Sequence, residues 1–258
     1  MIEMLSTEYW VLFPVGVLVA TMGMSSGISG SNFWIPIYLI AMELEPAVAF
    51  WMSLLTMLFG FGSGVVRNVA DGTISWPLVR RYARVALPAA AVCAVIAARL
   101  DQRLLILAFS CFALVYGGSM FVGAWRGLEA RSLPGPISAL LGGAFQGAIA
   151  TGAGTWMLPS LLDEPEIEHH ASAVGSSVVV LFGCSLVAVV LRMDPMLIDA
   201  LMANRADVAN MVVFAAPGVL IGGQLGPRVA QRLPQAMIRP YVGGLLILVA
   251  VFVASRAI

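Results

Sequence analysis

The sequence contains no lysine, and only 11% of its 258 residues are charged. A soluble domain carries about 25% charged residues, so this composition cannot cover a water-exposed surface. The 14 basic residues are all arginine, are balanced by 14 acidic residues and are scattered between apolar runs. Without a basic stripe or an excess of positive charge, nucleic-acid binding has no support.

Cysteine and catalytic motifs are also lacking. Cys93, Cys111 and Cys184 stand singly in apolar runs, without the paired spacing of a metal or redox site. The chain has no nucleophile elbow, phosphate loop, zinc-binding H-E-x-x-H pair or dinucleotide fingerprint. The sequence therefore predicts no metal, no cofactor and no catalytic residues, and the protein is not expected to be an enzyme.

Apolar sequence is what the chain has in excess, with 60% hydrophobic residues and a mean hydropathy of +0.94. A hydrocarbon core of about 30 Å is crossed by roughly 20 apolar helical residues, and the chain has room for about eight such spans. Their approximate ranges are 9–42, 47–66, 77–98, 104–125, 136–162, 171–191, 207–227 and 239–255. We expect an all-α, multi-pass protein of the cell inner (plasma) membrane.

The first and fifth segments are too long for one straight span, and each contains a run of small residues. These runs centre on Ser29-Gly30-Ser31 and on Gly152-Ala153-Gly154. Irregular backbone is tolerated at membrane depth only where protein buries it or where it lines a cavity. We therefore predict that both segments are broken helices.

The two broken segments belong to an internal repeat. Placing Pro36 on Pro159 also superposes Leu39 on Leu162, Glu43 on Glu166, Ser53 on Ser176, Leu58-Phe59-Gly60 on Leu181-Phe182-Gly183, and Asp71 on Asp194. Several of these matches are not aliphatic, so a biased composition does not explain them. We predict two homologous transmembrane repeats, residues 1–131 and 132–258. Secondary transporters commonly bind substrate between such repeats, at broken helices near the bilayer midplane.

A polar residue and then a proline follow each run of small residues. If a helix restarts there, Asn32 and Thr155 are placed to cap it, and Pro36 and Pro159 fall in its first turns, where proline costs least. Free N–H groups and the positive end of the helix dipole would then favour an oxyanion. The alternative is that the small residues merely permit close helix packing. The duplication favours a binding site.

These motifs resemble the TauE/SafE sulfite exporter family over essentially the whole chain. The resemblance also rests on the Ala/Ser-rich starts of the following spans, 49–53 and 171–177, and on the stretch Gly222-Gly223-Gln224-Leu225-Gly226-Pro227-Arg228. It implies transport, commonly outward, of sulfite, of an organosulfonate such as sulfoacetate, or of a related organic anion. The family's glycine runs are usually fuller, and the extra hydroxyls of this chain favour a different or larger substrate than sulfite.

The repeat and the resemblance together give the candidate substrate-binding residues. They are Ser29, Gly30, Ser31, Asn32, Ser53, Gly152, Gly154, Thr155, Ser176 and Ser177. Gln146 and Gln224 also lie in apolar spans, where a hydrogen bond between helices is a commoner role than substrate contact. The expected partners are a small anionic substrate and the lipid bilayer, and homo-oligomerisation stays open.

Topology and mechanism leave alternatives open. If every predicted span crosses the membrane, most arginines fall on the side of the two termini, which places the termini inside. If the broken segments are instead re-entrant hairpins, each repeat loses a crossing and the two repeats become inverted. A non-transporting accessory or assembly protein and an anion channel remain rivals to the carrier.

Overall fold

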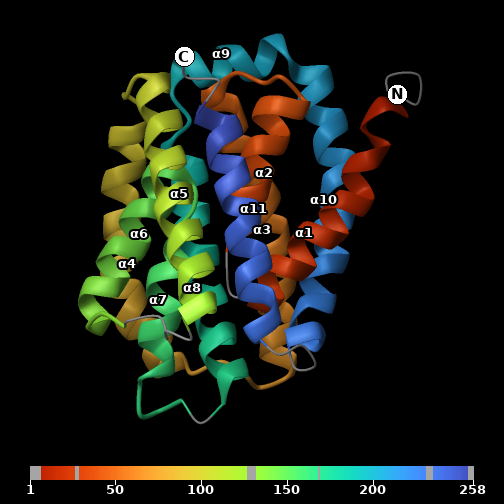
Figure 1. The fold of residues 1–258 in the computed structure, drawn as a ribbon. Helices are drawn as coiled ribbons and strands as arrows, with labels where there is room; N and C mark the ends of the chain where they lie inside the picture. The colour runs from red at the N-terminus through yellow and green to blue at the C-terminus, as the bar shows by residue number, and fades with distance from the viewer. Residues whose placement is uncertain (1–6, 27–28, 127–131, 168, 231–234, 255–258) are drawn as a thin grey trace.

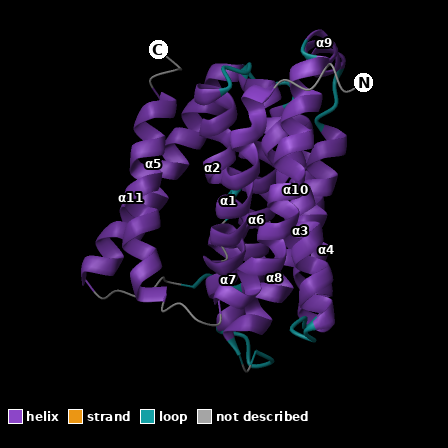
Figure 2. Cartoon of the chain, turned by 90° about the vertical axis from the view of Figure 1, so that its right-hand side faces the viewer, coloured by secondary structure: helices purple, strands orange, loops and turns teal. Residues whose placement is uncertain are grey.

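The computed structural model describes residues 7–26, 29–126, 132–167, 169–230 and 235–254. Within these residues the chain is helical, without a β-strand (Figures 1 and 2). The α-helices are α1 (Leu12–Ser26), α2 (Ser31–Pro36), α3 (Pro46–Ala70), α4 (Trp76–Ala97), α5 (Gln102–Arg126), α6 (Gly135–Ile149), α7 (Ala153–Leu162), α8 (His170–Leu191), α9 (Pro195–Ala203), α10 (Arg205–Ala230) and α11 (Gln235–Ala254). A 3-10 turn, Thr7–Val11, precedes α1, and a π-helical segment, Ile37–Ala41, extends α2.

The apolar segments of the sequence correspond to these helices. The two long segments contain α1 with α2 and α6 with α7, and the others contain α3, α4, α5, α8, α10 and α11. Five stretches of the described chain are long and apolar enough to cross a membrane: Glu8–Ser25, Pro46–Ala70, Gln102–Gly123, His170–Leu191 and Arg205–Val229. The chain is therefore a multi-pass membrane protein, as the sequence predicts.

The short helix α9 was not expected from the sequence. Asp194 caps it by accepting a hydrogen bond of 2.7 Å from the Leu197 N–H, and Pro195 occupies its first turn. An aspartate cap followed by proline is a typical helix start. The link between the spans at 171–191 and 207–227 thus folds as a helix at one end of the bundle (Figure 1).

The end of the bundle that carries α9 is also where α1 and α3 begin. Tyr9 Oη, just before α1, donates a hydrogen bond of 3.0 Å to Asp207 Oδ1 at the start of α10. Trp51 Nε1, near the start of α3, donates one of 3.0 Å to the Val189 carbonyl near the end of α8. The chain between Tyr9 and Trp51 therefore leaves from and returns to one end of the bundle, as Figure 1 shows.

α6 and α7 form a second return at the opposite end. The rings of Phe145 and Trp156 lie 5.9 Å apart, and a Cβ on Gly142 would lie 3.0 Å from Met157 Cγ. These pairs require the two helices to run antiparallel. At their outer ends, a Cβ on Gly135 would lie 3.2 Å from Glu164 Oε1.

Glycines allow α6 to pack on α4 and α10 to pack on α1. A Cβ on Gly143 would lie 2.1 Å from the Ala86 carbonyl oxygen, and one on Gly147 would lie 2.2 Å from that of Ala90. In the other pair, a Cβ on Gly218 would lie 2.2 Å from the Phe13 carbonyl oxygen. Such close backbone contact is a common mode of helix association in membranes. Gly222 belongs to the same contact between α1 and α10, with a Cβ position 2.7 Å from the Val17 carbonyl oxygen.

α5 and α11 form a pair on one side of the bundle (Figure 2). A Cβ on either Gly117 or Gly243 would lie 2.9 Å from the carbonyl oxygen of the other. Large apolar side chains on these helices, such as Leu107, Val115 and Phe252, are exposed. Such faces suit contact with lipid acyl chains.

Candidate substrate site

The chain leaves the α-helical conformation between α6 and α7. Ala150 has φ +60° and Gly152 has φ +100°. The first is tolerated at a cost by an L-residue, whereas the second favours glycine. α7 begins after Gly152, and its first hydrogen bond runs from the Trp156 N–H to the Gly152 carbonyl, at 3.2 Å. The earlier N–H groups of α7 therefore lie at a free helix end.

The other run of small residues leads into α2 without a left-handed residue among its described positions. The Phe33 and Trp34 N–H groups both donate to the Gly30 carbonyl, at 3.0 and 3.2 Å. The hydroxyls of Ser29 and Ser31 lie 2.9 Å apart and share a hydrogen bond. All of these residues are buried, so the polar groups of this segment lie inside the bundle.

The prediction that Asn32 and Thr155 cap the restarted helices is wrong. The residues at the N-cap positions are Gly30 and Gly152, and neither cap makes a side-chain hydrogen bond. Asn32 and Thr155 instead lie inside the first turns of α2 and α7. Their side chains are thus free for other partners.

A hydrogen bond joins the two segments of small residues. Thr151 Oγ1 donates to Asn32 Oδ1 at 2.7 Å, and both side chains are completely buried. Thr151 lies in the turn between α6 and α7, and Asn32 lies in α2. The sequence singled out Asn32 but did not single out Thr151 as a site residue.

Several buried donors near these segments have no hydrogen-bond partner among the described residues. They are Asn32 Nδ2, Thr155 Oγ1, Trp34 Nε1 and Trp156 Nε1. Leaving a buried donor unpaired costs about 1–3 kcal/mol, so each is suited to bind a polar ligand. One of these donors, on Asn32, belongs to α2, and another, on Thr155, belongs to α7, so each segment of small residues is followed by an unpaired donor.

The hydroxyls of the candidate residues on α3 and α8 are engaged elsewhere. Ser53 Oγ donates to the Phe50 carbonyl at 2.7 Å, and Ser177 Oγ donates to the Val174 carbonyl at 2.9 Å. Ser176 Oγ accepts a hydrogen bond of 2.9 Å from the Ser75 N–H, immediately before α4. The contacts of these serines are thus to backbone, and none of these hydrogen bonds joins them to Asn32 or Thr151.

Two further polar residues hold the end of α6. Gln146 Nε2 donates to Ser185 Oγ on α8 at 3.0 Å and to the Ala150 carbonyl at 3.3 Å. Arg192 donates through Nε to the Gly147 carbonyl at 3.2 Å and through Nη2 to the Ala148 carbonyl. The expected hydrogen bond from Gln146 to another helix is confirmed. The sequence did not identify Arg192, because its burial depends on the packing of α8 against α6.

The outer end of α7 is held by a separate network. Tyr82 Oη lies 2.7 Å from Ser160 Oγ and donates to Glu164 Oε1 at 2.9 Å. Arg81 pairs with Glu164 and, at 3.8 Å, with Glu166. These contacts attach the outer end of α7 to α4. Among the described residues, no group of three His, Cys, Asp or Glu side chains is placed to hold a metal ion.

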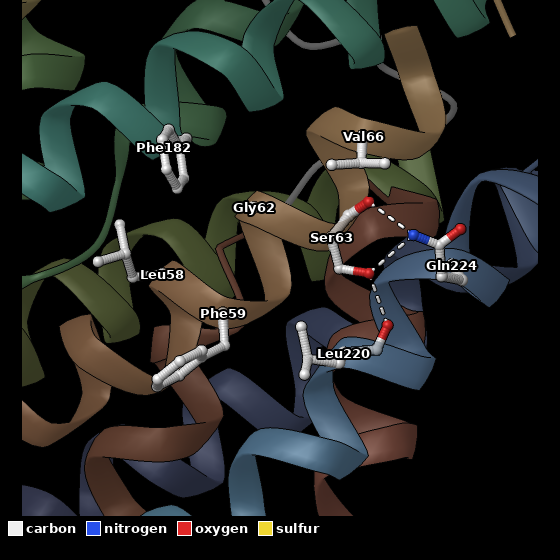
Figure 3. A pocket seen from close by; sticks show the side chains of 8 residues that line it. All are labelled: Leu58, Phe59, Gly62, Ser63, Val66, Phe182, Leu220 and Gln224. Atoms are coloured by element: carbon white, nitrogen blue, oxygen red, sulfur yellow. Dashed lines mark hydrogen bonds between the residues drawn. The ribbon is translucent and has the colours of Figure 1, made fainter. Parts of the chain in front are cut away.

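An apolar groove of about 500 Å³ lies between α3, α8 and α10 (Figure 3). Its walls include Phe59, Val66 and Leu220, all of which are exposed. At one side, Gln224 Nε2 donates to the Ser63 carbonyl at 2.8 Å and to its hydroxyl at 2.9 Å. Gln224 thus joins α10 to α3, as expected. An open apolar groove suits lipid acyl chains better than a small anion.

The family comparison agrees with the resemblance found in the sequence. A family model described as "Sulfite exporter TauE/SafE" matches residues 12–253. This range contains α1 to α10 and nearly all of α11, and with them Asn32, Thr151 and Thr155. No curated protein and no solved structure matches the chain.

Proposed function

This chain belongs to the TauE/SafE sulfite exporter family, and from that premise we propose that it is a carrier of one small oxyanion. The substrate class is sulfite or an organosulfonate such as sulfoacetate, and transport is outward across the plasma membrane. The observation that carries this proposal is the hydrogen bond between Thr151 and Asn32. It brings the two segments of small residues together beside unpaired buried donors.

The proposed architecture is a pair of inverted repeats. In the first, α1 and α2 form a re-entrant hairpin and α3, α4 and α5 cross the membrane; in the second, α6 and α7 form the hairpin and α8, α10 and α11 cross. Two observations support this arrangement. Both hairpins return to the end at which they start, and they do so at opposite ends of the bundle.

The contacts between helices are also symmetric between the two proposed repeats. α1 packs on α10 as α6 packs on α4, while α3 packs on α8 and α5 on α11. Exchanging the repeats leaves this set of contacts unchanged. A site at the tips of two inverted hairpins is equally related to both sides of the membrane, which alternating access requires.

The donors at the proposed site suit an oxyanion. Asn32 Nδ2 and Thr155 Oγ1 are buried without partners in the described chain, and Ser29 and Ser31 add hydroxyls. The free N–H groups at the start of α7 add the positive end of a helix dipole, worth about 0.3–1 kcal/mol and up to about 2 kcal/mol when partly buried. Such a set binds an anion with modest affinity and can release it to either side.

The experiment is a substrate panel on the purified protein. Ligand-induced thermal stabilisation is compared for sulfite, sulfate, thiosulfate, sulfoacetate, taurine and lactate, with Asn32→Ala as a matched variant. We expect a sulfite or organosulfonate response that weakens in Asn32→Ala. If no anion changes the melting temperature, the non-transporting accessory reading is favoured. A separate flux measurement distinguishes a carrier from a channel, because flux that rises linearly with anion concentration, without saturation, would favour a channel.

A further inference from the structure

Arg192 is a buried charged residue that is not among the residues of the proposed site. It follows α8, and only 5% of its surface is exposed. Its guanidinium donates to the Gly147 and Ala148 carbonyls, near the end of α6, and lies 5.9 Å from the centre of the Phe50 ring. The ion pairs found within the described residues involve Arg67 and Arg81, and none includes Arg192.

A buried guanidinium without a carboxylate partner is unusual. Removing a charge from water is expensive, and ionisable groups inside membranes usually pair with one another or mark substrate pathways. The carbonyl end of a helix carries only about half a negative charge. The α6 end therefore compensates Arg192 in part, and a positive potential remains around it.

The remaining potential lies beside the proposed anion site. Arg192 binds the Gly147 carbonyl in the last turn of α6, and Thr151 follows the end of that helix by two residues. Thr151 in turn contacts Asn32. The same two carbonyl contacts hold α6 where it ends, just before Ala150 adopts φ +60°.

We propose that Arg192 is the positioning and charge-selecting residue of the anion site. Its charge favours anions over neutral solutes of the same shape, and its two hydrogen bonds fix the end of α6 and thereby Thr151. This inference rests on the proposed function, because it assumes an anion at the Thr151–Asn32 contact. Arg192 acts on the substrate through its electric field and through α6, not by a direct contact.

Two variants separate the charge from the hydrogen bonds. Arg192→Gln keeps one amide donor but loses the charge, whereas Arg192→Lys keeps the charge but loses the forked donor. Arg67→Gln is the matched control, because Arg67 is partly exposed and pairs at 2.8 Å with Asp71, which directly follows the same helix, α3. The probes are sulfate, methanesulfonate and dimethyl sulfone, which are all tetrahedral at sulfur and carry net charges of minus two, minus one and zero.

Binding is measured for each probe by competition against the best anion of the panel. Two unit charges about 10 Å apart at an effective dielectric of about 20 interact strongly enough to change affinity by about tenfold. Arg192→Gln should therefore lower the affinity for methanesulfonate about tenfold and the affinity for sulfate by considerably more. Its affinity for dimethyl sulfone should be unchanged. Arg192→Lys should stay within about threefold of the wild type for all three, while unfolding at a lower temperature because it has lost a carbonyl contact.

The outcomes are distinguishable. If the wild type binds no anion, the proposed function fails and this inference fails with it. Suppose that the wild type binds anions and that Arg192→Gln folds. If the variant then loses the same affinity for all three probes, or loses affinity for none of them, the charge-selecting role is wrong. If both Arg192 variants fail to fold while Arg67→Gln folds, Arg192 is a structural residue and the inference is overturned.

Discussion

Thr151 Oγ1 donates a 2.7 Å hydrogen bond to Asn32 Oδ1, and this bond joins the turn between α6 and α7 to the first turn of α2. The two residues lie in different halves of the chain, and both are fully buried. Because they come from the two segments of small residues, the bond connects the proposed hairpins at their tips.

Replacing Thr151 by valine should destabilise the protein and weaken anion binding. Valine keeps the shape but removes the donor, which leaves the buried Asn32 Oδ1 unpaired at a cost of about 1–3 kcal/mol. Thermal unfolding of Thr151→Val, Asn32→Ala and the double variant measures the coupling between the two residues. Ser119→Ala is the control, because that exposed hydroxyl bonds only within its own helix. Additive effects of the two single changes would contradict a direct contact.

Thr155→Val should weaken anion binding without lowering stability. The Thr155 hydroxyl is buried and has no partner among the described residues, so its removal relieves an unpaired group. Loss of one hydrogen bond to a charged ligand is worth about 1.5–3 kcal/mol, roughly a 10- to 150-fold change in affinity. Thermal shift and competition binding on the same sample check both parts. A marked fall in melting temperature with unchanged affinity would show that the hydroxyl is structural.

Gly152→Ala should destabilise the turn between α6 and α7. Its φ of +100° disfavours an L-residue, and an added Cβ would lie 2.8 Å from Phe145 Cβ. A strained residue of this kind costs about 1–3 kcal/mol. Gly118→Ala is the matched control, because a Cβ there meets no atom within 4 Å and alanine favours a helix interior by up to about 1 kcal/mol. Equal melting temperatures of the two variants would argue against this backbone geometry.

Gly143→Ala should disturb the packing of α6 against α4 rather than substrate binding. Its Cβ would lie 2.1 Å from the Ala86 carbonyl oxygen, so α6 and α4 would have to separate. Overpacking of this kind costs about 1–3 kcal/mol or more. Size-exclusion profiles and melting temperatures should change, while the affinity of the protein that remains folded should not. Unchanged stability would contradict the close packing of α4 and α6.

The sequence predicted the helices well because their signals are local. Runs of apolar residues bounded by charges located the longer helices, and Gly152 lies in a turn whose positive φ favours a residue without a side chain. Cap positions were misplaced by two or three residues, since Gly30 and Gly152 serve as caps without a side-chain bond. A glycine cap leaves no side-chain signal in the sequence.

The long-range contacts could not be predicted in the same way. Thr151 stood in a recognised run of small residues, yet its pairing with Asn32 depends on how two hairpins meet. Arg192 resembled any other arginine at the end of a span, and only the packing of α6 against α8 buries it. Ser53, Ser176 and Ser177 remain predictions as substrate contacts, although their hydroxyls bond to backbone groups.

The most direct test of the account is anion flux in proteoliposomes with matched protein content. Flux of labelled sulfite, or of the organosulfonate that gives the largest thermal shift, is measured against concentration for the wild type, Ser31→Leu and Gly154→Leu. We expect saturable flux in the wild type and its loss in both variants, with all three proteins monodisperse, because a leucine side chain would occupy the position proposed for the anion. Wild-type flux in both leucine variants would contradict a substrate site at the Thr151–Asn32 contact.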